Sequence, residues 1–272
     1  DLALVDGPTR APEPWVHVPD ADAAVDDLRE RVSRSPLAAV TLVQVLRAGA
    51  ERGFDDALVI ESLAYSMLQA GPEFERWLAA RPAPRPRPAE ARVLSAERRG
   101  DELDVVLDRP QVRNAMNAAL RDALCEVLEV AVVDDGIDRV RLSGRGPDFC
   151  SGGDLDEFGT SPDPATAHRI RTSRAPASLV AAMAGRVEVE LHGACVGAGI
   201  EIAAAAGRVI AAPDTRLRLP ELGMGLIPGA GGTASLPRRI GRHRTAWLAL
   251  SGVWLGAGTA IDWGLVDEVV TG

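Results

Sequence analysis

The chain has 272 residues, of which 46% are hydrophobic and 25% are charged. This composition is typical of a globular protein and excludes a disordered chain, a collagen-like fibre and a disulfide scaffold. The formal net charge of −9 argues against general binding to nucleic acids or membrane surfaces, because both present negative phosphates. All 30 cationic residues are arginines, so neither a P-loop lysine nor a Schiff-base lysine is available.

The cysteines and histidines are too few and too dispersed to indicate a metal site or a disulfide framework. Cys125, Cys150 and Cys195 are far apart, and the four histidines do not cluster with acids at metal-ligand spacing. We therefore expect no metal and a reducing, cytoplasmic setting. No run of eighteen apolar residues occurs, so we expect no membrane partner.

The first region of the chain, residues 1–80, is predicted to be mainly helical. Residues 1–20 suggest irregular structure, and residues 21–80 suggest helices. Ser35 followed by Pro36 is typical of a helix N-terminus, and apolar residues then recur at helical spacing. Residues 81–91 begin with RPAPRPRP, which favours an extended linker.

The second region, residues 92–272, alternates predicted strands with predicted helices. The expected strands are at 93–96, 103–107, 140–142, 187–191, 209–211 and 265–270. The expected helices are at 117–133, 164–184, from 198 onward, and 231–250. Strands and helices that alternate at short intervals predict an α/β fold.

Two glycine-bearing loops follow predicted strands and lead towards predicted helices. They are DFCSGGDL at 148–155 and HGACVGAGIE at 192–201. Small residues let backbone N–H groups approach a ligand, and a helix N-terminus adds unsatisfied donors and a positive dipole end. Facing each other, the loops would form an oxyanion hole, although each alone could be a tight turn. Neither fits a dinucleotide fingerprint or a serine-hydrolase elbow.

Two glutamates, Glu201 and Glu221, stand among apolar neighbours in the sequence. A carboxylate buried without a partner is costly, so the pattern leaves two interpretations open. Each glutamate could be solvated on its own. Alternatively, the two could share one desolvated cleft, in which their pKa values would separate so that one acts as acid and the other as base.

From about residue 92 onward the chain resembles the enoyl-CoA hydratase/isomerase (crotonase) family. The resemblance rests on RPQVRNAMN at 109–117, FCSGGDL at 149–155, GACVGAGIEIA at 193–203 and LPELGMGLIPGAGGT at 219–233. It implies a spiral core of ββα units, a homotrimer or dimer of trimers, and acyl-CoA thioester substrates whose enolate the protein stabilises. Coenzyme A belongs to the substrate, so no separate cofactor is expected.

The resemblance also implies residue roles. Glu201 would activate water, Glu221 would protonate the α-carbon, and the N–H groups of Gly153 and Ala198 would form the oxyanion hole. The residues expected to contact substrate are Arg113, Ala115, Gly152, Asp154, Leu155, Gly197 and Leu226. The implied reaction is hydration of 2-trans-enoyl-CoA to 3-hydroxyacyl-CoA. The alternatives are a double-bond isomerase, another acyl-CoA-processing member, or a non-catalytic acyl-CoA-binding subunit.

The order of the segments departs from the family. The family continues with helices beyond a strand like GLVDEVV, whereas here residues 36–81 resemble those helices and precede the core. We therefore hypothesise a circular permutation that places the helical cap at 1–80. The alternative is an unrelated helical extension. Arg81, Arg85 and Arg87 are candidate contacts for the CoA phosphates.

Overall fold

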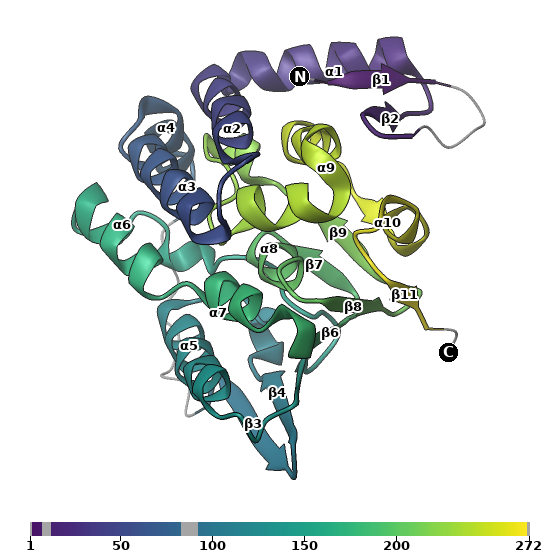
Figure 1. Cartoon of the computed structure of the whole chain (residues 1–272). Coiled ribbons are helices and arrows are strands. Elements are labelled where there is room, and N and C mark those ends of the chain that lie inside the picture. The colour runs from purple at the N-terminus through teal and green to yellow at the C-terminus, as the bar shows by residue number, and fades with distance from the viewer. Residues whose placement is uncertain (1, 7–11, 83–91, 271–272) are drawn as a thin grey trace.

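A mostly parallel sheet of six strands supports the second region of the chain (Figure 1). The computed structural model describes residues 2–6, 12–82 and 92–270. The sheet order is β11-β8-β6-β5-β4-β3, and only the β3–β4 pair is antiparallel. Its strands are β3 Leu94–Arg99, β4 Glu102–Leu107, β5 Arg139–Gly144, β6 Val187–Leu191, β8 Arg208–Ala211 and β11 Glu268–Val269. The predicted α/β class is confirmed, although β11 is shorter than the predicted strand at 265–270.

A second, smaller sheet carries the strands that lead into the site. It pairs β7 (Ala194–Val196) with β9 (Arg216–Arg218), and β9 with β10 (Leu255–Gly256). The chain passes from β6 into β7 through Gly193, whose φ is +55°. A Cβ at Gly193 would stand 2.1 Å from the Pro147 carbonyl oxygen, so this turn requires glycine. Strands this short leave no clear alternation in the sequence, and they were not predicted.

Helices and short 3-10 turns connect the strands of the core. The helices are α5 Ala118–Val133, α6 Pro164–Ser173, α7 Pro176–Ala182, α8 Ala198–Ala203, α9 Gly232–Ser251 and α10 Ala257–Trp263. The 3-10 turns are η1 Pro110–Val112, η2 Leu155–Glu157, η3 Ala184–Arg186 and η4 Glu221–Met224. The single helix predicted at 164–184 is wrong: Pro176 disfavours helical geometry at Ala175, so α6 and α7 are separate.

The first region contains a strand pair followed by four helices. β1 (Ala3–Val5) and β2 (Trp15–His17) pair in parallel, which corrects the prediction of irregular structure at 1–20. The predicted helical stretch is confirmed as α1 Ala21–Arg34, α2 Pro36–Gly49, α3 Phe54–Gln69 and α4 Pro72–Ala79. The predicted linker lies outside the described residues from position 83 onward.

A glutamate from α4 caps α2. Ser35 occupies the N-cap position as predicted, but its side chain makes no capping hydrogen bond. Instead the Glu73 carboxylate accepts hydrogen bonds from the N–H groups of Leu37 (2.8 Å) and Ala38 (3.0 Å). A long-range contact therefore does what the local sequence assigns to Ser35, and it ties two of the helices together.

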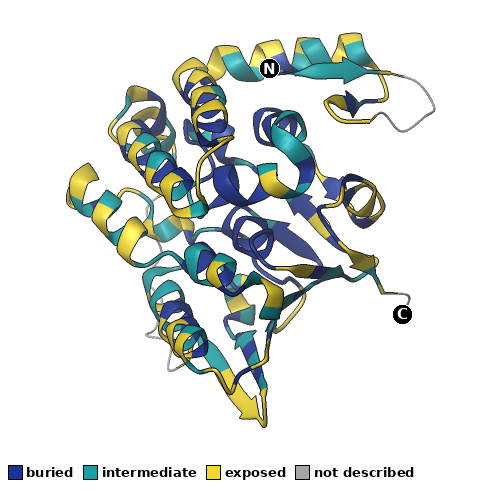
Figure 2. Cartoon of the chain, viewed as in Figure 1, coloured by how far each residue is buried: buried dark blue, intermediate teal, exposed yellow. Residues whose placement is uncertain are grey.

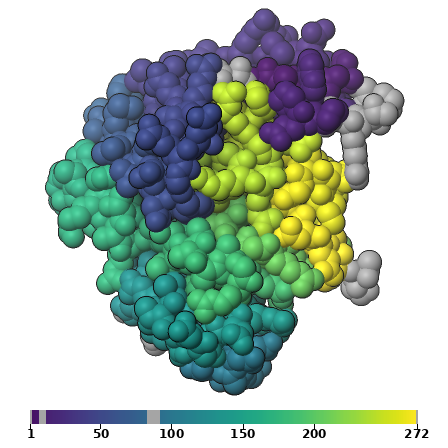
Figure 3. All heavy atoms as spheres, in the orientation of Figure 1, coloured from purple at the N-terminus to yellow at the C-terminus, as the bar shows by residue number. Residues whose placement is uncertain are grey.

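These N-terminal helices lie directly on the core. α2 and α3 pack against α9, α3 packs against α6, and α4 meets η4. Figure 3 shows the blue helices seated on the yellow-green α9 and beside the teal α6. The helical region thus forms one wall over the core rather than a separate body.

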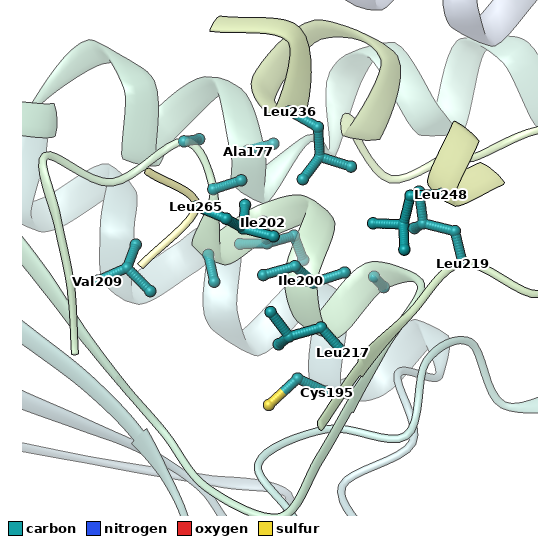
Figure 4. Close-up of a cluster of buried hydrophobic side chains, with 14 of the residues drawn as sticks. Ala177, Cys195, Ile200, Ile202, Val209, Leu217, Leu219, Leu236, Leu248 and Leu265 are labelled. Atoms are coloured by element: carbon teal, nitrogen blue, oxygen red, sulfur yellow. The ribbon is translucent and has the colours of Figure 1, made fainter. Parts of the chain in front are cut away.

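The most deeply buried part of the core surrounds α8 (Figure 2). All six residues of α8 are buried. Figure 4 shows Ile200 and Ile202 packed among the buried side chains of Leu217 and Leu236. This packing fixes the short helix that carries Glu201.

Candidate active site

A cavity of about 650 Å³ opens where both glycine loops approach each other. Residues 151–155 and 196–198 line it, together with Glu201 and Glu221. The two loops and two glutamates singled out in the sequence therefore meet at one place. A cavity of this size is in the range of small-molecule sites.

Gly153 and Ala198, whose N–H groups are the predicted oxyanion-hole donors, both line this cavity. The Met116 N–H donates to the Gly152 carbonyl (2.7 Å), and the Asp154 N–H donates to the Met116 carbonyl (2.8 Å). These two hydrogen bonds form a β-bridge between Met116 and Gly153 that does not use the Gly153 N–H. Ala198 is the first residue of α8, where N–H groups lack partners within the helix. No hydrogen bond between described residues uses the N–H of Gly153 or Ala198.

One carboxylate oxygen of Glu201 is held by backbone donors. Its Oε2 accepts hydrogen bonds from the N–H groups of Ala230 (2.7 Å) and Gly232 (2.9 Å). The side chain is buried, and burial together with the charges of Glu221 and Glu61 raises its pKa well above the usual range. The two N–H donors favour the ionised form and fix which oxygen faces the cavity.

Glu221 is also buried, but it lacks the backbone hydrogen bonds that hold the Glu201 Oε2 atom. Its Oε2 has no hydrogen-bond partner among the described residues. Burial raises the pKa of Glu221 to about 8; the charge of Glu61 adds to this rise, and Arg218 opposes it. This carboxyl is therefore able to hold a proton near neutral pH and to release it into the cavity.

Gly197 separates the two carboxylates. A Cβ added there would stand 2.6 Å from Glu221 Oε1 and 3.6 Å from Glu201 Oε1. Of the two interpretations left open by the sequence, the structure has the shared, desolvated cleft. The charge of Glu221 raises the pKa of Glu201, so the pair tends to retain one proton.

The predicted substrate contacts divide into two groups. Gly152, Asp154, Leu155 and Gly197 line the cavity. The Asp154 carboxylate also pairs with the buried Arg109 guanidinium (3.1 Å), so it also anchors its own loop.

The other predicted contacts, Arg113, Ala115 and Leu226, do not line this cavity. The Arg113 side chain is exposed and lies 3.6 Å from Asp148, and Leu226 is fully buried in the core. Arg81 is not among the lining residues, but it donates to the carbonyl of Leu155, which lines the cavity, and it stacks on Trp77. Arg85 and Arg87 lie outside the described residues.

Two residues of α3 belong to the site although the sequence did not identify them. Tyr65 lines the cavity, and a Cβ added to Gly229 would stand only 2.3 Å from a carbon of the Tyr65 ring. Glu61 accepts hydrogen bonds from the Gly231 and Thr233 N–H groups, each 2.8 Å long. A signal was present, because Glu61 lies within the apolar series Leu58, Tyr65 and Leu68 of one helix, where a charged residue is unusual.

Within the described ranges, no three or more His, Cys, Asp or Glu residues gather so that they could hold a metal ion. No described helix combines the length and the apolar character needed to cross a bilayer.

Comparison with known proteins identifies the family. Residues 102–272 match the enoyl-CoA hydratase/isomerase family. An enoyl-CoA isomerase/hydratase of Mycosarcoma maydis is 34% identical, over 62% of this chain and 65% of its own. The 2,3-dehydroadipyl-CoA hydratase of Escherichia coli is also 34% identical, over 65% of this chain and 68% of its own.

Solved structures agree with the sequence relatives. The crystal structure of an enoyl-CoA hydratase from Thermoplasma volcanium superposes with a TM-score of 0.60 at 36% identity, covering 65% of this chain and 71% of that one. The chain thus spans about two thirds of the length of the relatives it matches. With its core, its glycine loops and its sequence all in agreement, the chain belongs to the enoyl-CoA hydratase/isomerase (crotonase) family.

Proposed function

We propose that the protein hydrates 2-trans-enoyl-CoA to 3-hydroxyacyl-CoA. The observation that carries the proposal is the pair of buried carboxylates around Gly197, in the same cavity as the Gly153 and Ala198 N–H groups. The names of several relatives, which include hydratases of enoyl-CoA substrates, support it.

In this mechanism the thioester carbonyl oxygen accepts hydrogen bonds from the N–H groups of Gly153 and Ala198. These donors withdraw electrons from the conjugated double bond and stabilise the enolate oxygen as water adds. One donor of this kind contributes roughly 3–4 kcal/mol to the transition state. The reaction moves only water and protons, so we propose that it needs no metal or redox cofactor.

The two glutamates divide the proton transfers. The reacting form of the pair carries its single proton on Glu221, because the Ala230 and Gly232 N–H groups stabilise an ionised Glu201. The free oxygen of Glu201 then takes a proton from water, and the water oxygen bonds to the β-carbon. The Glu221 carboxyl, with its pKa of about 8, gives its proton to the α-carbon. A proton then passes from Glu201 to Glu221 across the short gap beside Gly197, which restores the starting state of the pair.

The test is the loss of the conjugated enoyl-thioester absorbance of crotonyl-CoA. We expect rapid loss in the wild type, a decrease in rate of about 10²–10⁴-fold in Glu201→Gln and in Glu221→Gln, and no change in Glu126→Gln. Glu126 is an exposed residue of α5 and serves as the control. A wild type that binds the CoA ester but leaves its absorbance unchanged would overturn the hydratase proposal.

Double-bond isomerisation is the second candidate, and the state of Glu221 favours it. One carboxyl with a free oxygen and a pKa near neutrality could carry a proton between two carbons by itself. The enoyl-CoA isomerase/hydratase of Mycosarcoma maydis is among the relatives, at 34% identity. Conversion of a 3-enoyl-CoA that persists in Glu201→Gln and disappears in Glu221→Gln would select the isomerase.

We also propose that the protein is a homotrimer or a dimer of trimers, as the resemblance implies. An exposed apolar stripe on α3, formed by Val59, Leu63 and Met67 at helical spacing, supports self-association. Light scattering should give a trimer mass or twice that mass, and Leu63→Glu with Met67→Glu should reduce it.

Finally, we propose that α2–α4 take the place of the helical cap in a permuted chain. Their packing on α9 and η4, and the presence of Tyr65 in the cavity, support this. A rearranged chain in which residues 36–81 follow the core should fold and keep activity. Failure of such a chain to fold, while the wild type folds, would favour an unrelated extension.

A further inference from the structure

The segment Ala230–Thr233 lies between two buried carboxylates. Glu201 accepts hydrogen bonds from the Ala230 and Gly232 N–H groups through Oε2. Glu61 accepts from the intervening donors, the Gly231 N–H through Oε1 and the Thr233 N–H through Oε2. Four consecutive backbone donors are thus shared alternately between one glutamate of the core and one of the helical region.

Both carboxylate oxygens of Glu61 are hydrogen-bonded to this segment. Its side chain is only 2% exposed, and Oε2 accepts a third hydrogen bond from the Thr233 hydroxyl (2.7 Å). The segment is the start of α9, where unpaired N–H groups and the positive dipole end favour a carboxylate. The three groups that hydrogen-bond to Glu61 are all donors, so the contact requires a residue that accepts hydrogen bonds on both oxygens.

The segment has little freedom to find another arrangement. Gly231 has a φ of +110°, and a Cβ there would stand 2.6 Å from the Ala177 side chain. A Cβ on Gly232 would stand 2.7 Å from the Glu201 side chain. A shift of this backbone would therefore move the two donors that orient Glu201.

We infer that Glu61 is a positioning residue: by fixing the start of α9 it holds the Glu201 carboxylate in the orientation that water activation requires. The helical region would then complete the active site instead of only covering it. This inference rests on the proposed hydration, in which Glu201 is the base.

The charge of Glu61 adds a second effect. The groups that face it are Tyr65 on its own helix, Arg171 of α6, Glu201 of α8 and Glu221 of η4. Ionised Glu61 raises the pKa of both Glu201 and Glu221 and so helps to keep a proton on the pair. Without that charge, the Glu221 pKa falls and its acid form is lost at a lower pH.

The experiment compares Glu61→Gln and Glu61→Asp with Glu73→Gln. Glu73 is the matched control, because it is another buried carboxylate of the helical region that caps a helix, but it caps α2. For crotonyl-CoA hydration we expect Glu61→Gln to lower kcat by about 10–100-fold with little change in KM. The high-pH limb of its kcat/KM profile should move to lower pH. Glu61→Asp keeps the charge and should keep that limb while lowering kcat. Glu73→Gln should lower only Tm.

A second measurement does not depend on activity. Amide hydrogen exchange should show that Glu61→Gln loses protection at Ala230 and Gly232, whose N–H groups donate to Glu201 and not to Glu61, whereas Glu73→Gln keeps it. Unchanged protection there, or a folded Glu61→Gln with wild-type kcat and pH profile, would overturn the inference. An inactive wild type with the expected exchange result would overturn the proposed hydration and leave the positioning contact established.

Discussion

The core and the helical region contribute to the same cavity in different ways. The core supplies Glu201, Glu221 and the two glycine loops, each within a short motif that resembles the family. The helical region supplies Tyr65, which packs against Gly229 of the core, and Glu61, which accepts hydrogen bonds from the Gly231 and Thr233 N–H groups. In the proposed mechanism the reacting groups thus lie in local motifs, whereas the groups that hold them in place come from distant segments.

The largest effect is expected where the core has no room to change. Gly197→Ala would place a Cβ 2.6 Å from Glu221 Oε1 on a backbone with a φ of +48°. We expect at least a 100-fold loss of crotonyl-CoA hydration, because the carboxylates would be forced apart. Gly185→Ala, where a Cβ would meet nothing within 4 Å, is the control and should retain full activity. A Gly197→Ala variant with wild-type activity would show that hydration does not depend on this arrangement of the two carboxylates.

The next effect concerns the pH profile and compares the two regions directly. In the proposed mechanism Glu221 acts as an acid, so kcat/KM should fall as the pH rises through about 8. Arg218 of the core lowers the Glu221 pKa, whereas Glu61 of the helical region raises it. Arg218→Gln should therefore move this high-pH limb to higher pH, opposite to Glu61→Gln. Parallel shifts in both variants, measured from kcat/KM against pH, would contradict this electrostatic account.

A smaller effect is expected at the aromatic wall that the helical region provides. Tyr65 lines the cavity and covers Gly229. Tyr65→Ala should enlarge the cavity and shift the preference of kcat/KM towards longer or bulkier acyl chains by roughly tenfold. Tyr65→Phe keeps the ring and should leave the preference unchanged. If a series of enoyl-CoA esters shows the same preference in all three proteins, Tyr65 does not bound the acyl pocket.

The smallest effect should be confined to the helical region. Glu73→Gln keeps the size of the side chain but weakens two hydrogen bonds at the start of α2. Loss of a helix cap costs about 1 kcal/mol, so we expect a Tm lower by a few degrees with hydration unchanged. Thermal unfolding and the crotonyl-CoA assay together check this. A large loss of activity would show that the helical region couples to the site more widely than through α3.

Local sequence determined much of this protein. Helices at 21–80, strands such as Leu103–Leu107 and the α/β class follow from the spacing of apolar residues and from glycine and proline. The four motifs also sufficed to identify the family of the core. The predictions fail where an element is too short for a pattern, as at Ala194–Val196, or where a proline divides one apolar pattern into two helices, as at Pro176.

Tertiary structure alone decided how the site is completed. Glu61 and Gly231 are 170 positions apart, and although a charge within an apolar helical series marks Glu61 as unusual, no local pattern identifies Gly231 as its partner. The elevated pKa of Glu221 likewise depends on what packs around it, because desolvation is set by the whole surroundings of a carboxyl. The sequence determined which groups can react, and the packing of α3 on α6 and α9 decided which distant carboxylate holds them in place.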